Sequence, residues 1–281
     1  MTRPVRIGIS TCPNDTFTFH ALLAGEVEIP GVELSIELMD VEQLNQRLHA
    51  GELDLAKASF HAMLIRSEAL WVLPSGAALG FGVGPLLLGA PGRAAERAVL
   101  PTSAHVLCPG RWTTATLLFR LLHPEPVELE QRLFSAILPE LSAGRADYGV
   151  CIHEARFTWR EHGVRFVEDL GASWEQRTGV ALPLGGLAVR RELGRELAQR
   201  LARGVRASLE WGLARREACL PTMRRHAQEQ SDAVLWSHVE LYVNEWTVEL
   251  GPAGREALRT LSRLAREQRL LPEPAGELEF L

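Results

Sequence analysis

Four short segments contain side chains that can bind an anion and accept a proton. They are residues 10–15, 57–59, 110–114 and 152–156, and each is expected to follow the end of a strand. Together they supply hydroxyl groups, one ammonium group, helix N-termini and one imidazole. Carboxylates and phosphates favour such donors, and an imidazole beside them can act as a general base. The pattern therefore predicts a pocket for a small carboxylate with a base next to it.

His153 is the strongest candidate for that base among the nine histidines of the sequence. It follows a predicted strand at residues 148–152 and opens a predicted helix at residues 154–161. A positive helix end and partial burial both lower the pKa of an imidazole, which keeps the ring neutral and able to take a proton. A lone histidine at a strand end can also be purely structural, so this alternative stays open. Three other histidines lack such a placement, namely His20, His61 and His105.

Donors for the anion are expected from two further places. Thr113 and Thr114 begin a predicted helix, where free backbone N–H groups and the helix dipole favour an anion, although a threonine there can simply cap the helix. Lys57 is the only lysine in a sequence whose other basic residues are all arginine. Its compact ammonium suits a tight pocket better than a guanidinium fork, unless it is a surface lysine without a role. Ser59 lies beside it and adds a hydroxyl group.

The end of the first predicted strand offers more polar groups for the same cleft. Ser10, Asn14 and Asp15 can all reach it. For Asn14 and Asp15, capping of the helix expected from Pro13 to about Ala24 is the simpler interpretation. We include Ser10 and Asn14 among the predicted substrate-binding residues.

The elements that must position these residues alternate between strand and helix, which indicates an α/β fold. A weak internal repeat points to two similar units. Residues 48–56 (LHAGELDLA) match residues 141–149 (LSAGRADYG) at a constant offset, and each copy fits a helix, an Ala-Gly turn, an aspartate and a strand. Short matches of this kind can also arise by chance.

Two similar α/β lobes are expected to hold a ligand between the carboxyl ends of their strands and to close around it by a hinge motion. We predict crossings between the lobes at residues 84–89 and 185–190. One lobe then comprises residues 1–88 and 187–281, and residues 89–186 form a second lobe inserted into it. From residue 192 onward, the periodicity predicts helices only.

Composition excludes several classes of protein. A net charge of -5 with interspersed signs gives no basic stripe for a nucleic acid, and no apolar run is long enough to span a membrane. The first ten residues are typical of a strand rather than an export signal, so we expect a cytoplasmic protein. Its four cysteines are widely spaced, so we expect reduced thiols and no metal site. No hydrolase, dinucleotide or phosphate-loop motif is present.

Five motifs in a fixed order resemble those of the 1,4-dihydroxy-6-naphthoate synthase family, which acts in the futalosine route to menaquinone. They are residues 10–17 (STCPNDTF), 57–59 (KAS), 80–86 (GFGVGPL), 109–115 (PGRWTTA) and 152–158 (IHEARFT). Two positions depart from the family pattern: Thr11 stands where proline is frequent, and Trp112 where histidine is common.

The resemblance implies a fold, an activity and residue roles. The fold would be the two-lobed type II periplasmic-binding-protein fold with a ligand cleft between the lobes. The activity would be a lyase reaction that converts cyclic dehypoxanthinylfutalosine to 1,4-dihydroxy-6-naphthoate and releases a three-carbon fragment, without a cofactor. His153 would be the proton acceptor, and substrate binding would involve Lys57, Ala58, Ser59, Thr113 and Thr114.

Two alternatives remain at this point. A chorismate dehydratase of the same pathway would have the same lobes and a carboxylate substrate, and a non-catalytic protein that binds a small carboxylate would share the fold. The sequence leaves the oligomeric state open.

Overall fold

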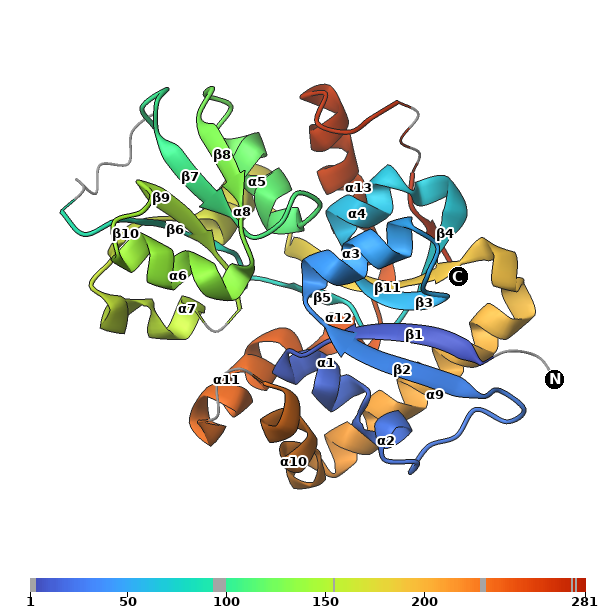
Figure 1. Cartoon of the computed structure of the whole chain (residues 1–281). Coiled ribbons are helices and arrows are strands. Elements are labelled where there is room, and N and C mark those ends of the chain that lie inside the picture. The colour runs from blue at the N-terminus through green and yellow to red at the C-terminus, as the bar shows by residue number, and fades with distance from the viewer. Residues whose placement is uncertain (1–3, 93–99, 154, 228–230, 274, 276) are drawn as a thin grey trace.

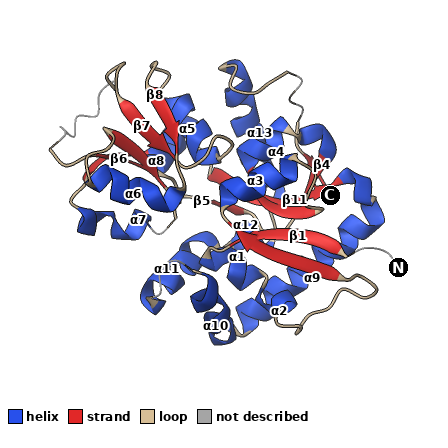
Figure 2. Cartoon of the chain, in the orientation of Figure 1, coloured by secondary structure: helices blue, strands red, loops and turns tan. Residues whose placement is uncertain are grey.

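Two β-sheets form the frame of the protein, and helices flank both of them (Figures 1 and 2). The computed structural model describes residues 4–92, 100–153, 155–227, 231–273, 275 and 277–281. The first described strand and the C-terminus both lie at the larger sheet (Figure 1). This arrangement is the α/β class that the alternating pattern predicted.

The first sheet has seven strands in the order β12-β4-β11-β3-β1-β2, with β5 paired to β11. Strands β2 and β3 run parallel to β1 on either side of it, whereas β11 runs antiparallel to β3. The bounds are β1 (Val5–Ser10), β2 (Leu34–Met39), β3 (Leu55–Ser59), β4 (Leu70–Val72), β5 (Ala78–Gly80), β11 (Leu182–Arg190) and β12 (Glu279–Phe280).

The second sheet has five strands in the order β10-β6-β9-β7-β8. Its centre repeats the parallel arrangement, because β8 and β9 flank β7 in the same direction. The bounds are β6 (Leu86–Gly89), β7 (His105–Cys108), β8 (Glu128–Gln131), β9 (Tyr148–Cys151) and β10 (Arg165–Asp169).

Helices connect these strands and form most of the C-terminal third. The α-helices are α1 (Pro13–Thr18), α2 (His20–Leu23), α3 (Val41–His49), α4 (Phe60–Ile65), α5 (Thr114–Leu122), α6 (Phe134–Ser142), α7 (Ala155–Thr158), α8 (Leu170–Thr178), α9 (Arg195–Ala214), α10 (Arg216–His226), α11 (Asp232–Tyr242), α12 (Glu245–Val248) and α13 (Gly251–Glu267). Short 3-10 helices are η1 (Ser67–Ala69), η2 (Trp159–His162) and η3 (Arg191–Leu193).

The internal repeat has a structural counterpart in both sheets. The Asp54 amide donates to the carbonyl of Arg6 at 2.8 Å, and the Arg6 amide donates to the Asp54 carboxylate at 2.9 Å. The Asp147 amide donates to the carbonyl of His105, and the His105 amide donates to the Asp147 carboxylate, both at 3.0 Å. Each aspartate thus joins the start of one strand to the start of its parallel neighbour. The same structural unit therefore occurs once in each lobe.

The chain crosses between the sheets before β6 and before β11. The predicted division, with residues 1–88 and 187–281 in one lobe and residues 89–186 in the other, remains a proposal. Strand pairing favours an earlier first crossing, because all of β6 belongs to the second sheet. At this crossing, a Cβ on Gly84 would lie 2.2 Å from the Cα of Gly171, so only glycine permits this approach of two backbones.

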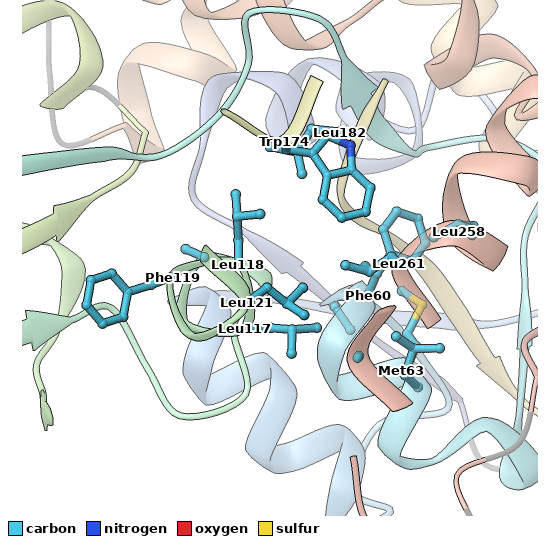
Figure 3. Packing of buried hydrophobic residues seen from close by; sticks show 14 of the residues in the cluster. Phe60, Met63, Leu117, Leu118, Phe119, Leu121, Trp174, Leu182, Leu258 and Leu261 are labelled. Carbon is cyan, nitrogen blue, oxygen red and sulfur yellow. The ribbon is translucent and has the colours of Figure 1, made fainter. Parts of the chain in front are cut away.

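One apolar core contains buried side chains from both lobes. Leu117 and Leu121 lie on the face of α5 that is turned toward Phe60 of α4 and Leu261 of α13, whereas Phe119 points to the opposite side (Figure 3). All of these side chains are buried. Helix α5 is therefore held between the second sheet and the helices of the first lobe, which places its N-terminus at the cleft.

Three predicted elements differ from the structure. The helix expected from Pro13 to about Ala24 breaks at Phe19, after Thr16 and Thr18 hydroxyls have bonded to backbone carbonyls one turn earlier. The helix expected at residues 154–161 is a single turn, α7, followed by η2, and residue 154 lies outside the described residues. The tail, predicted as all helical, ends in β12, which pairs with β4.

Candidate active site

One pocket between the sheets contains all eight residues that the sequence singled out. Its free volume, counted together with the open solvent at its mouth, is about 680 Å³. Ser10 and Ser59 end β1 and β3, Thr114 begins α5, and His153 follows β9. The eight predicted residues on the lining are Ser10, Asn14, Lys57, Ala58, Ser59, Thr113, Thr114 and His153.

The Lys57 ammonium forms a buried ion pair with Asp15. Its Nζ lies 2.7 Å from Oδ1 of Asp15, and it also donates to the carbonyl of Gly76 at 3.1 Å. The Ser10 hydroxyl donates to the other carboxylate oxygen at 2.6 Å, and the Asn14 amide donates to Oδ1 at 3.0 Å. An ammonium has three protons, so one remains for a ligand. Lys57 is not an idle surface lysine, and the side chains of Asn14 and Asp15 do not cap the helix.

Ser59 is held by a side chain that sequence reasoning did not consider. The Asn45 amide donates to the Ser59 hydroxyl at 3.2 Å, and the Ser59 N–H donates back to the Asn45 carbonyl oxygen at 2.9 Å. Because the serine oxygen accepts this bond, its own proton can be donated into the pocket. Ala58 can contribute only backbone groups, and its partner in the sheet is Gly186.

The two threonine hydroxyls are occupied within the protein. Thr113 caps α5, since its Oγ1 accepts from the Thr116 N–H at 3.2 Å and donates to the Gly110 carbonyl at 2.8 Å. Thr114 Oγ1 donates to the carbonyl of Leu184 at 2.6 Å. Capping, which the sequence left open, is therefore the function of the Thr113 hydroxyl. The donors left for a ligand at this end of the pocket are the backbone N–H groups of Thr114 and Ala115, because the Thr116 N–H bonds to Thr113.

His153 lies on the lining in a left-handed backbone conformation, with φ of 55°. Its Nδ1 lies 3.2 Å from the Cys12 sulfur, and its ring centroid lies 4.7 Å from that of Phe134. The expected helix behind it is only one turn, α7, so the dipole of a long helix does not act on the ring. Contacts with Cys12 and Phe134 orient the imidazole instead. A strained backbone at a pocket residue is typical of functional sites.

Sequence reasoning missed two pocket residues in the helical tail, His238 and Tyr242. They lie one turn apart on α11, and their ring centroids are 4.5 Å apart. His238 is 1% exposed, and its Nε2 lies 3.0 Å from Oδ1 of Asn14. Burial, and next the nearby His153 and Lys57, hold the pKa of His238 well below its usual range. Their spacing on one helix face was visible in the sequence, but only the fold shows that α11 reaches the cleft.

Trp112, one of the two departures from the family pattern, lies at the contact between the lobes. Its ring stacks on His49 of α3 with centroids 4.3 Å apart, and its backbone N–H faces the Glu42 carboxylate at 3.3 Å. Burial raises the pKa of Glu42. Neither Trp112 nor Thr11 lines the pocket. These two departures therefore leave the pocket wall unchanged, and only Trp112 has contacts that join the lobes.

Among the described residues, no group of three or more histidine, cysteine, aspartate or glutamate side chains is arranged to hold a metal ion. The same part of the chain contains no helix that is both long enough and apolar enough to cross a membrane. All four cysteines are buried thiols outside any disulfide, and burial raises the pKa of Cys108 and Cys151 to about 12.

The sequence is similar to that of known proteins along nearly its whole length. Residues 5–267 match the menaquinone biosynthesis family. A 1,4-dihydroxy-6-naphthoate synthase from Thermus thermophilus is 44% identical over 278 residues, which cover 99% of both chains. A second protein of that name, from Streptomyces coelicolor, is 39% identical and covers 95% of both chains.

Solved structures with the same fold include a protein from Archaeoglobus fulgidus, with a TM-score of 0.86, 26% identity and coverage of 95% of this chain and 98% of that one. The periplasmic aliphatic sulphonate binding protein of Escherichia coli has a TM-score of 0.64 at 14% identity, with coverage of 98% and 90%. The two-lobed fold is therefore that of the periplasmic binding proteins, as the motifs implied.

Proposed function

The chain belongs to the menaquinone biosynthesis family, and on that premise we propose that it converts cyclic dehypoxanthinylfutalosine to 1,4-dihydroxy-6-naphthoate with release of a three-carbon fragment. It would act as a carbon–carbon lyase in the cytoplasm. The family match and the two relatives support an enzyme of this pathway. The observation that carries the proposal is the position of His153 on the wall of the one pocket that also contains Lys57 and the start of α5.

In this proposal, His153 is the general base. It removes a proton from an acidic C–H of the bound substrate and so starts an elimination that ends in an aromatic ring. Aromatisation supplies the driving force. The Cys12 sulfur lies 3.2 Å from Nδ1 and 3.8 Å from Nε2, so we assign this step to Nε2, the nitrogen farther from the sulfur.

The anionic group of the substrate would be held by three kinds of donor. These are the remaining proton of the Lys57 ammonium, the Ser59 hydroxyl and the backbone N–H groups at the start of α5. Because Asp15 balances the charge of Lys57, the backbone donors of α5 and the hydroxyl carry more of the recognition than a lone ammonium would suggest. Closure of the lobes would exclude water from the reacting atoms.

Two alternatives predict different results. A chorismate dehydratase would act on chorismate, and a capture protein would bind a carboxylate without turnover. The relatives favour neither alternative. Both are named 1,4-dihydroxy-6-naphthoate synthases, and their similarity to this chain extends over nearly its whole length.

The test is incubation of the purified protein with cyclic dehypoxanthinylfutalosine and, separately, with chorismate, with products followed by absorbance and mass spectrometry. We expect a naphthoate product only from the first substrate. Turnover of chorismate, or binding of either compound without reaction, would overturn the proposal.

A further inference from the structure

His238 has a buried ring nitrogen, Nδ1, that the proposed mechanism does not use. The residue lines the active-site pocket, and no hydrogen-bond partner lies against its Nδ1 within the part of the chain that the structure describes. A buried polar atom without a partner costs about 1–3 kcal/mol, so such atoms are rare unless a ligand or water completes them.

The neighbouring side chains define the tautomer of this ring. The Asn14 Nδ2 group donates to the Asp15 carboxylate, so Asn14 must present its carbonyl oxygen, Oδ1, to His238. That oxygen can only accept, so Nε2 of His238 carries the proton. Nδ1 is then an unprotonated nitrogen with a free lone pair. Asp15 is itself held by Lys57 and Ser10. The hydrogen bonds that lead from Asp15 through Asn14 to His238 therefore fix the orientation of each side chain.

The ring also stays neutral when its neighbour takes up a proton. The His238 and His153 rings are nearly parallel, at 16°, with centroids 6.2 Å apart. Full burial disfavours a charge on His238, and a cation on His153 disfavours it further. His238 is therefore a hydrogen-bond acceptor throughout the reaction and not a second base.

We propose that Nδ1 of His238 accepts a hydrogen bond from a hydroxyl group on the ring that becomes aromatic, and thereby determines specificity for a hydroxylated ligand. The inference rests on the proposed function, whose product carries two phenolic hydroxyl groups. A phenolic O–H is a strong donor, and a buried imidazole nitrogen beside the general base is a matched acceptor. The site would reject a ligand without the hydroxyl, because that ligand leaves the nitrogen unpaired.

Two substitutions of similar shape test the roles of the two ring nitrogens separately. His238→Gln places an amide near the position of Nε2, so it can retain the bond to Asn14 while the acceptor at Nδ1 is lost. His238→Asn places an amide oxygen near Nδ1, so it retains an acceptor while the bond to Asn14 is lost. The two variants therefore distinguish ligand recognition from support of Asn14.

The experiment compares the Kd of 1,4-dihydroxy-6-naphthoate with that of 2-naphthoate, which lacks both hydroxyl groups, by anaerobic calorimetry. We expect the wild type to prefer the dihydroxy compound, and we expect this preference to fall about tenfold in His238→Gln. His238→Asn should keep most of it. Affinity for 2-naphthoate should change by less than about twofold in either variant, a result that a purely structural role would not produce.

Three outcomes would overturn the inference: no preference in the wild type, the same preference in His238→Gln, or an equal loss of affinity for both compounds. Should His238→Gln not fold, the ¹⁵N shift of Nδ1 in the wild type provides the same answer, since it should move with the dihydroxy compound and not with 2-naphthoate. Turnover of cyclic dehypoxanthinylfutalosine by the wild type is measured first. Its absence would reject the proposed function, whereas turnover with an unchanged preference would reject only the role of His238.

Discussion

The ammonium of Lys57 lies 2.7 Å from the carboxylate of Asp15, and both side chains are more than nine-tenths buried, at 8% and 6% exposure. Removing one partner of a buried pair leaves an uncompensated charge, which is far more costly than removing both. The pair therefore links the stability of the protein to the geometry of the pocket.

Replacing the lysine alone, as in Lys57→Met, is expected to lower the free energy of unfolding by about 3–5 kcal/mol and to abolish turnover. The double variant Lys57→Met with Asp15→Leu should recover most of the stability but none of the activity. Urea denaturation monitored by circular dichroism measures the first quantity. The exposed pair Arg263–Glu267 is the matched control, and Arg263→Ala should cost less than about 1 kcal/mol. If Lys57→Met and Arg263→Ala lowered the free energy of unfolding equally, this account of Lys57 would be contradicted.

His153→Ala should lower kcat by about 10²–10⁴-fold, because it removes the proposed base, while binding of the product should change little. Single-turnover kinetics and product titration measure the two effects. His105→Ala is the control: that residue bonds to Glu130 away from the pocket, so its loss should leave turnover unchanged. Wild-type rates in His153→Ala would exclude the assignment.

The contact between Cys12 and His153 predicts a smaller, purely kinetic effect. Cys12→Ala removes the group 3.2 Å from Nδ1, so kcat should fall about five- to tenfold while KM stays nearly constant. Cys12→Ser retains a hydroxyl partner and should recover much of the loss. Cys219→Ala removes a buried thiol elsewhere in the core and should not affect kcat. A rise in KM without a change in kcat would show that the thiol serves binding and not orientation of the base.

His61 predicts how stability depends on pH. It lies between the lobes, where its Nδ1 contacts the carbonyl of Thr113, and burial lowers its pKa to about 4. In the unfolded chain, His61 takes up a proton near pH 6.5, whereas in the folded protein it does so only near pH 4. The contribution of His61 to the free energy of unfolding is therefore complete above pH 6.5 and is lost as the pH falls toward about 4.

The loss amounts to about 3 kcal/mol at most for a shift of this size. His61→Asn can keep the donor to Thr113 without a titrating ring. Its stability should therefore fall less steeply between pH 6.5 and 4 than that of the wild type, and the two curves should run parallel above pH 7. Identical slopes in urea titrations across that range would contradict the prediction.

The sequence alone was enough to predict the class of the fold and most of its strands. Alternation of strand and helix is a local property, and so is the Ala-Gly-x-x-Asp pattern whose aspartates, Asp54 and Asp147, make the same pair of bonds in both sheets. Strand ends could likewise be located, and since the carboxyl ends of parallel strands face one cleft, Ser10, Ser59 and His153 were expected near one another.

Tertiary structure decided which polar groups are free and which are occupied. Thr113 caps its helix, Asp15 neutralises Lys57, and His238 arrives from a helix far along the chain. These relations depend on the contacts of residues distant in sequence, which no local periodicity encodes. Residue types and their order thus determined where the pocket would form, whereas long-range packing determined the hydrogen bonds that select its donors and acceptors.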